Sequence, residues 1–152
     1  MHAKKKALRY ALDQLDPKGL RSFVGRSLLL TRDAEEREIQ ALLGLARAFA
    51  AFDGLGIKTP LFENELYYAL FFDQSTRTKS SWAGAAARLG GHPVIVDGSS
   101  TQVSHGETAE ETGAMLGMNA HALGIRHDLI LGEGNSFMRD AKKGIDDHLA
   151  KT

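Results

Sequence analysis

The chain has 152 residues, of which 19 are basic, 19 are acidic and none is cysteine, and 43% of it is hydrophobic. A chain of this size buries about 70% of the surface that its unfolded form exposes, so its core needs no disulfide or structural metal. Because the net charge is zero, we expect neither nucleic acid nor a membrane surface as a partner, and any anion site must be local. Residues 1–16 lack the apolar run of a signal peptide, so we expect a cytoplasmic protein.

Two helices are predicted in the first part of the chain. Residues Lys4–Leu15 predict a short basic helix that stops at Pro17 and Gly19, because both residues disfavour continuation. A second helix is predicted to begin near Asp33, whose carboxylate can cap free amides, with Glu36 three residues later in the capping-box position. Apolar residues then recur every three or four positions, which indicates one buried helical face.

Strands and helices are predicted to alternate in the rest of the chain. The run Leu66–Phe72 is aromatic and aliphatic without alternation, as expected for a strand covered on both faces of a parallel sheet. The elements predicted after it are a helix over 76–89, a strand over 92–96, a helix over 107–119, a strand over 122–126 and a last helix capped by Asn135 or Ser136. This order predicts the α/β class, as a single domain with a doubly wound parallel sheet flanked by helices. The long connections 97–106 and 127–134 are expected to bind ligand.

A polar, cationic turn follows the first predicted strand, at the point where a helix begins. Unpaired amides and the positive end of the helix dipole face such a turn, which makes it an anion-binding position. Ser75, Thr76 and Thr78 add hydroxyl donors, and Arg77 offers a forked guanidinium for phosphate oxygens. The alternative is an ordinary Ser/Thr helix cap followed by two solvated cations. The glycine-rich motifs of the common nucleotide loops are absent from the sequence.

This turn belongs to a longer pattern. Ser75–Lys79 has the sequence Ser-Thr-Arg-Thr-Lys and resembles the Ser-Thr-Arg-Thr-Arg carbamoyl-phosphate loop of aspartate and ornithine carbamoyltransferases. Ser100–Thr108 resembles the mobile loop between that family's next strand and helix, and Gly124–His127 resembles the end of its following strand. The similarity runs from about Gly25 to Asp147. The Ser-His-Gly-Glu-Thr segment and residues 131–139 are most similar to a transcarbamylase branch with an unsettled acceptor.

The resemblance implies a site for carbamoyl phosphate. Four consecutive residues would bind its phosphate group: Ser75, Thr76, Arg77 and Thr78. Thr78 and Arg126 would also reach the carbamoyl oxygen. The candidate catalytic residues are Arg77, Thr78 and Arg126, with the two arginines as electrostatic stabilisers. Fixed cations and hydroxyls can stabilise the charge that develops during carbamoyl transfer without a cofactor, and the six histidines show no metal-site spacing. We therefore expect neither a cofactor nor a metal.

Two residues of the expected mobile loop are predicted to act in a neighbouring subunit. By resemblance to the family, Gln102 and His105 would enter the adjacent active site of a homotrimer; the alternative is an exposed, variable loop. Lys79 stands where the family has arginine, which keeps the charge but loses the planar fork of a structural ion pair. His121 is expected to be structural, and for His127 a supporting role near the site and a solvated turn both stay open.

The family's His-Pro-x-Gln motif, which helps hold the carbamoyl group, is missing from this sequence. His92-Pro93 is followed by Val-Ile and begins a predicted strand, so it is not that motif. We expect residues 1–152 to form the carbamoyl-phosphate-binding domain, with a core at about 25–147, and the acceptor-binding second domain to be absent. Three hypotheses follow: half of an enzyme that is inactive alone, one chain of a split enzyme completed by a separate acceptor-domain chain, and an oligomerisation or regulatory module without catalysis.

Overall fold

The computed structural model describes residues 2–152, which divide into two compact units. The first unit ends at Thr59, and the second runs from Pro60 to Thr152. The first is helical, whereas the second contains the parallel sheet and the helices that flank it, which confirms the predicted α/β class. Within residues 2–152, no helix combines the length and the apolar character needed to cross a bilayer.

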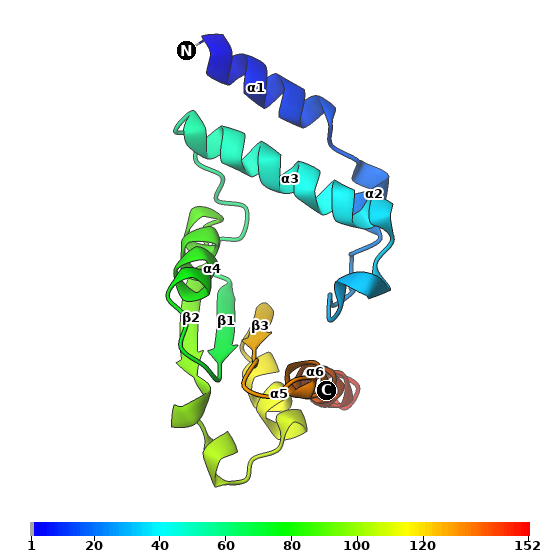
Figure 1. Ribbon diagram of the computed structural model, residues 1–152, viewed down its shortest axis with the longest axis vertical. Helices are drawn as coiled ribbons and strands as arrows, with labels where there is room; N and C mark the ends of the chain where they lie inside the picture. Colours follow the sequence, from blue (N-terminus) through cyan, green and yellow to red (C-terminus); the bar gives the residue numbers. More distant parts are fainter. Residues whose placement is uncertain (1) are drawn as a thin grey trace. The chain divides into compact units, whose positions relative to one another are not determined.

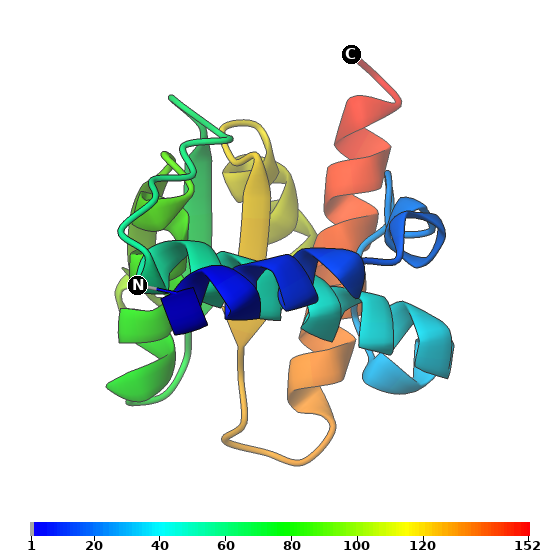
Figure 2. The same ribbon diagram turned by 90° about the horizontal axis from the view of Figure 1, so that it is seen from above.

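The first unit is built on two long helices that pack through small side chains. Its elements are α1 (His2–Asp13), α2 (Pro17–Arg21), a 3₁₀ turn (Thr31–Asp33) and α3 (Glu36–Gly54). α1 runs antiparallel to α3 in both ribbon views (Figure 1, Figure 2). Ala11 of α1 and Ala41 and Ala48 of α3 are buried. A side chain at Gly44 would come within 3.3 Å of the Gln14 carbonyl, so glycine allows this close approach.

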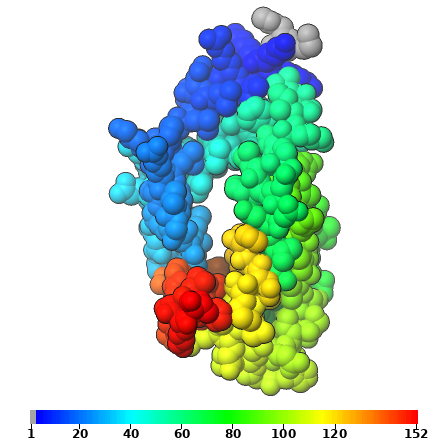
Figure 3. All heavy atoms as spheres, turned by 180° about the vertical axis from the view of Figure 1, so that it is seen from behind, coloured from blue at the N-terminus to red at the C-terminus, as the bar shows by residue number. Residues whose placement is uncertain are grey.

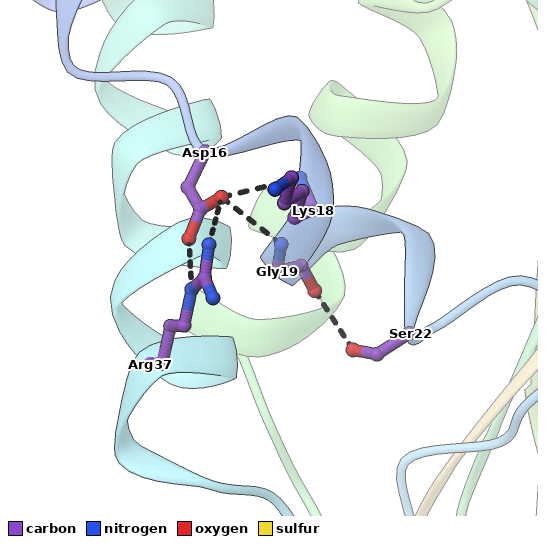
Figure 4. A network of polar contacts seen from close by, with 5 residues as sticks. All are labelled: Asp16, Lys18, Gly19, Ser22 and Arg37. Carbon is purple, nitrogen blue, oxygen red and sulfur yellow. Dashed lines mark hydrogen bonds and ion pairs between the residues drawn. The ribbon is translucent and has the colours of Figure 1, made fainter.

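The segment after α1 forms a further short helix. The first helix ends before Pro17, as expected, and Pro17 and Gly19 then lie inside α2. Proline is tolerated there because the first helical turn needs no amide from it. Asp16 caps α2: its Oδ1 accepts hydrogen bonds from the amides of Lys18 and Gly19, each at 3.1 Å. Arg37 of α3 donates from Nε to Asp16 Oδ2 at 2.5 Å and from Nη2 to Oδ1 at 2.9 Å (Figure 4).

The start of α3 corrects a prediction. Asp33 and Glu36 do not form the capping box, because Asp33 lies in the preceding 3₁₀ turn and the helix begins two residues later than that box requires. The box is formed by Glu35 and Glu38, whose Oε2 accepts from the Glu35 amide at 2.8 Å. Arg26 donates to the other oxygen of Glu38 at 2.8 Å, so this buried carboxylate is paired.

The second unit contains a three-stranded parallel sheet with the order β2-β1-β3. Its elements are β1 (Leu66–Phe71), α4 (Arg77–Arg88), β2 (His92–Asp97), α5 (Ala109–Gly117), β3 (Ala122–Arg126) and α6 (Glu133–Leu149). β1 is the central strand, and Ala69, Leu70 and Phe71 are buried in it, as the unalternating apolar run predicts. The strand is one residue shorter than expected, although the Phe72 amide still donates to the Arg126 carbonyl at 3.0 Å.

The last helix begins earlier than predicted. Asn135 and Ser136 are not its caps but lie in its first turn, because the chain turns at Gly132, whose φ of 90° favours glycine, and α6 starts at the next residue. Further along, α5 and α6 pack with their backbones close together, since a side chain at Gly113 or Gly144 would overlap the backbone of the other helix. In the space-filling view the end of α6 (red) lies beside the yellow segment that includes the end of α5 (Figure 3).

Two long connections link the strands to these helices, one from β2 to α5 and the other from β3 to α6. The segment after β2 forms two 3₁₀ turns, Gly98–Ser100 and Gln102–His105. α5 then begins two residues later than predicted, with Thr108 as its N-cap and Glu111 completing a capping box. Residues 127–132 connect β3 to α6. Both connections leave the carboxyl ends of their strands.

Candidate anion-binding site

The sheet places the ends of β1 and β3 side by side. Phe71, the last residue of β1, pairs with Arg126, the last residue of β3. The turn between β1 and α4 therefore lies next to the Arg126 side chain, at the carboxyl edge where open α/β sheets bind ligands. Thr76 precedes α4 without a capping hydrogen bond from its own side chain, so it does not occupy the amides that begin this helix.

The Arg126 guanidinium joins the two strand ends. Its Nη1 donates to Ser75 Oγ at 2.8 Å and lies 3.4 Å from Thr78 Oγ1. Three of the residues predicted for the site, from segments about fifty positions apart, therefore meet around one guanidinium. The cluster presents a guanidinium and two hydroxyl groups, and these are groups that bind phosphate and carbonyl oxygens.

Two carboxylates hold the other side of the same guanidinium. Arg126 Nη2 lies 2.9 Å from Asp73 Oδ2 and 2.8 Å from Asp128 Oδ2, and Arg126 Nε donates to Asp128 Oδ2 at 3.3 Å. A hydrogen bond with Asp128, together with burial, raises the pKa of Asp73, whereas the same hydrogen bond and Arg126 lower the pKa of Asp128. Asp73 therefore keeps its proton to a higher pH than an isolated aspartate would, whereas Asp128 loses its proton at a lower pH.

Sequence reasoning missed both acids. Asp73 follows the buried strand and precedes the hydroxyl residues of the turn, and its Oδ1 is buried without a hydrogen-bond partner in the described chain. Asp128 stands two residues after Arg126 in the β3–α6 connection. A polar residue at the end of a buried parallel strand is a signal that was available for Asp73, because ligand sites gather at these ends.

Of the two cations of the turn, Arg77 is exposed and Lys79 is half-buried. Arg77 is the first residue of α4, and within residues 2–152 it makes no ion pair or side-chain hydrogen bond. Lys79 Nζ lies 5.3 Å from the centre of the Phe71 ring, a cation–π distance. Hydrogen bonds from Ser99 are the main cause that lowers the pKa of Asp97 at the end of β2, and the charge of Lys79 adds to them. Lys79 thus contacts the ring of the central strand, and it has no carboxylate pair in the part of the chain that the structure describes.

Gln102 and His105 lie apart from this cluster in the contacts of the described chain. Both belong to the second 3₁₀ turn and are exposed. His105 Nδ1 is 3.3 Å from Ser104 Oγ, and Thr101 accepts a hydrogen bond from Val103 that begins the turn. Among residues 2–152, neither side chain forms a hydrogen bond or ion pair with Arg126. Their predicted role in a neighbouring subunit stays a prediction.

The histidines next to the sheet have structural contacts. His121 Nδ1 accepts a hydrogen bond from the Leu66 amide at 3.0 Å, which confirms its predicted structural role. The His127 side chain is only 13% exposed and packs 4.4 Å from the Phe72 ring between centroids, with Phe137 4.9 Å from Phe72, so His127 is not a solvated turn residue. In residues 2–152, no three His, Asp or Glu side chains form a group that could hold a metal ion.

The parallel sheet, with the Arg126 guanidinium and two hydroxyl groups at its carboxyl edge, defines an α/β domain with a candidate anion site. Residues 26–144 match the family model described as "Aspartate/ornithine carbamoyltransferase, carbamoyl-P binding domain". The chain belongs to the aspartate/ornithine carbamoyltransferase family, as the sequence motifs predict, and contains its carbamoyl-phosphate-binding domain.

Individual relatives agree with this assignment. The chain is 38% identical over 122 residues to YgeW of Escherichia coli (strain K12), whose name marks it provisionally as a carbamoyltransferase; the match covers 80% of this chain and 31% of YgeW. Ornithine carbamoyltransferase from Pyrococcus furiosus superposes with a TM-score of 0.70 at 30% identity, covering 79% of this chain and 37% of that one. Aspartate transcarbamoylase from Trypanosoma cruzi, in complex with carbamoyl phosphate, gives 0.71 at 27% identity, covering 86% and 41%. The chain spans about a third of the length of the curated relatives it matches.

Proposed function

We propose that this chain is the carbamoyl-phosphate-binding half of a transcarbamylase, which transfers a carbamoyl group from carbamoyl phosphate to an amine. The observation that carries the proposal is the convergence of Arg126 Nη1 on Ser75 Oγ and Thr78 Oγ1, at 2.8 and 3.4 Å. It joins two motifs that the family match includes. The binding domain would comprise residues 1–152, with its core at about 25–147.

The proposed roles follow from where charge develops. Ser75, Thr76, Arg77 and Thr78 bind the phosphate, and Thr78 and Arg126 donate to the carbamoyl oxygen. The neutral amine forms a bond to the carbamoyl carbon, the bond from that carbon to the bridging oxygen breaks, and the amine loses a proton. Negative charge collects first on the carbamoyl oxygen and then on the leaving phosphate. Cations fixed in advance stabilise both, because they need no reorganisation during the reaction.

The acceptor amine is proposed to bind outside residues 1–152. The His-Pro-x-Gln motif that helps hold the carbamoyl group in the family has no counterpart in this sequence. We therefore propose that the 152-residue chain alone transfers no carbamoyl group to ornithine, aspartate or other simple amines above background. An acceptor-binding domain outside residues 1–152 would complete the site, and a separate acceptor-domain chain is one alternative for supplying it. Product formation by the purified chain, with its intact mass verified, would contradict this part of the proposal.

Ligand binding tests the central part. Calorimetric titration with phosphonoacetamide, in which a CH₂ group replaces the bridging oxygen of carbamoyl phosphate, should detect weak binding to the wild-type chain. Arg77→Ala should weaken that binding by about 1.5–3 kcal/mol, because a charged hydrogen-bond donor to the phosphate is lost. Lys151→Ala is the matched control, since it removes an exposed cation outside the proposed site. Equal affinity in the wild-type and Arg77→Ala chains would overturn the phosphate-binding assignment.

We also propose that the site is shared between the subunits of a homotrimer. The proposal rests on the resemblance of the 100–108 segment to a loop that serves the adjacent subunit, and Gln102 and His105 are exposed in a turn there. In a head-to-tail ring each site would take Arg77 from one chain and His105 from the next.

Mixing two defective chains tests this sharing. Arg77→Ala and His105→Ala chains, each unable to bind the analogue, are unfolded and refolded together in equal amounts. About a quarter of the sites should recover, because each of two independent choices succeeds half the time in a heterologous ring. Light scattering must show that the sample is trimeric. If a trimeric sample recovers no sites, Arg77 and His105 do not serve one site from two chains.

A further inference from the structure

We propose that Asp128 is a positioning residue for the anion site: it holds one edge of the Arg126 guanidinium so that Nη1 faces the hydroxyls of the β1–α4 turn. The inference rests on the proposed function, because it names the residue that orients a proposed ligand-binding cation. It assigns a role to a carboxylate that neither the sequence motifs nor the family match singles out.

The geometry divides the guanidinium into two sides. Nε and Nη2 form one edge, and both donate to the same oxygen, Asp128 Oδ2, at 3.3 and 2.8 Å. Nη1 is on the other side and donates to Ser75 Oγ at 2.8 Å. Because the guanidinium is planar and rigid, fixing the Nε–Nη2 edge also fixes the direction of Nη1. The carboxylate therefore sets which donors of Arg126 face the turn.

Asp73 contacts the same cation but is a weaker candidate for this role. It contacts Nη2 alone, at 2.9 Å, whereas Asp128 contacts two nitrogens. Asp73 also precedes the turn that would close around an anion, so it approaches Arg126 from the ligand-binding segment itself. Asp128 belongs to the same strand end as Arg126 and follows it by two residues. It can keep its contact while a ligand changes the contacts of the turn.

Simple electrostatics and positioning predict opposite results when Asp128 is removed. A carboxylate beside the site repels a bound anion, so its loss alone should tighten anion binding. If Asp128 orients Arg126, its loss should weaken anion binding, because a mobile guanidinium must be ordered again when the ligand binds. The sign of the change therefore separates the two effects without depending on its size.

The test measures binding of inorganic phosphate to the full 152-residue chain by calorimetry. Asp128→Ala should weaken phosphate binding by about tenfold, and Asp128→Asn should restore part of the loss, because the amide oxygen still accepts from the guanidinium. Asp140→Asn is the control: Asp140 is an exposed carboxylate of α6, and its replacement removes one negative charge from the same compact unit. This control should bind phosphate as tightly as the wild-type chain or slightly more tightly.

A spectroscopic measurement follows Arg126 directly. The Nε proton of Arg126 should exchange slowly with water in the wild-type chain, rapidly in Asp128→Ala and at an intermediate rate in Asp128→Asn, as seen by NMR. Phosphate binding that is unchanged or tighter in Asp128→Ala would overturn the inference, as would slow exchange that persists in that variant. If the wild-type chain binds no phosphate, the proposed function fails, whereas the exchange rates still decide whether Asp128 orients Arg126.

Discussion

Two arginine–carboxylate clusters in this protein use the same chemical groups in different proportions. In the first unit, Arg37 pairs with one acid, Asp16, and the Arg37 hydrogen bond and the helix α2 amides lower the pKa of that acid to about 2. In the second unit, Arg126 faces two acids, and the pKa of Asp73 is raised while that of Asp128 is lowered. The first cluster has one acid for its one arginine, so its charges balance. The second has two acids for one arginine, so negative charge is in excess when both acids are ionised.

The difference indicates what each cluster is for. A single acid that both caps a helix and pairs with an arginine uses its oxygens within the fold, so the Asp16 cluster is a structural joint. The Arg126 cluster keeps Nη1 on hydroxyl groups that are themselves able to bind an anion, and it holds two acids that repel each other unless they share a proton. Two acids that share one cation cost stability that a single structural pair would not, and such arrangements are typical of functional sites.

Removing each arginine should give the largest contrast. Arg126→Ala should weaken phosphate binding by about 1.5–3 kcal/mol, because the cation that joins the two strand ends is lost. Arg37→Ala is the matched control and should leave phosphate binding unchanged, since Arg37 lies in the other unit and pairs with a helix cap. Calorimetry on both variants checks this. Equal losses in the two variants would remove the functional distinction between the clusters.

Acid unfolding should distinguish the structural joint next. The pKa of Asp16 is lowered from 3.8 to about 2, so its contribution to stability is present above 3.8 and is lost as the pH falls toward about 2. Asp16→Asn should therefore be less stable than the wild-type chain at neutral pH, with the difference shrinking through this window. Circular dichroism during urea unfolding at several pH values measures it, and Asp13→Asn, an exposed acid of α1, is the control. A difference that stays constant with pH would contradict the pairing.

The two-acid cluster should titrate in the opposite sense. Because the hydrogen bond with Asp128 is the main cause that raises the pKa of Asp73, Asp128→Asn should lower the pKa of Asp73 and leave it paired with Arg126 alone. Carboxyl-carbon NMR resolves the two acids, and Asp140→Asn should leave the pKa of Asp73 where it is. A pKa of Asp73 that does not move in Asp128→Asn would mean that the two acids do not share a proton.

The smallest expected effect concerns one hydroxyl. Ser75→Ala removes the oxygen that accepts from Arg126 Nη1 at 2.8 Å and should weaken phosphate binding by about 0.5–1.5 kcal/mol, the value of a single hydrogen bond. Ser81→Ala is the control, because Ser81 lies on α4 and its hydroxyl donates to the Thr78 carbonyl instead. If both substitutions have the same effect, the Ser75 hydroxyl has no part in the site beyond that of any helix hydroxyl.

Local pattern predicted most of the second unit. β3 has the bounds that its sequence predicts, and β1 differs by one residue, because an apolar run without alternation has few other structures available. The helix starts were less accurate. The capping box of α3 lies two residues beyond Asp33 and Glu36, and α6 begins at Glu133 rather than after Asn135 or Ser136. Several acidic and polar residues near each start satisfy the same capping rule, so the rule alone could not choose among them.

The contents of the candidate site were only half predictable. Ser75, Thr78 and Arg126 could be named because each belongs to a recognisable motif, and the structure brings them together. Asp128 belongs to no recognisable motif. Asp73 stands at a strand end where ligand sites gather, but its contact with Arg126 depends on β1 and β3 being neighbours in the sheet. The order of strands along the chain does not state that adjacency. The position of Asp73 was therefore readable from the sequence, but its arginine partner on another strand was not.

The glycine contacts between α5 and α6 also determine which parts of the second unit can move independently. Gly113 and Gly144 let the two backbones meet with no side chain between them, so neither helix can separate slightly without losing the whole interface. Amide hydrogens in these helices should therefore exchange with solvent only when the entire unit opens, at the slowest rates in the chain. The amides of residues 98–106, held by 3₁₀ turns and exposed hydroxyls, should exchange through small local openings. The exchange rates of the α5 and α6 amides then serve as the reference against which local opening of residues 98–106 is measured.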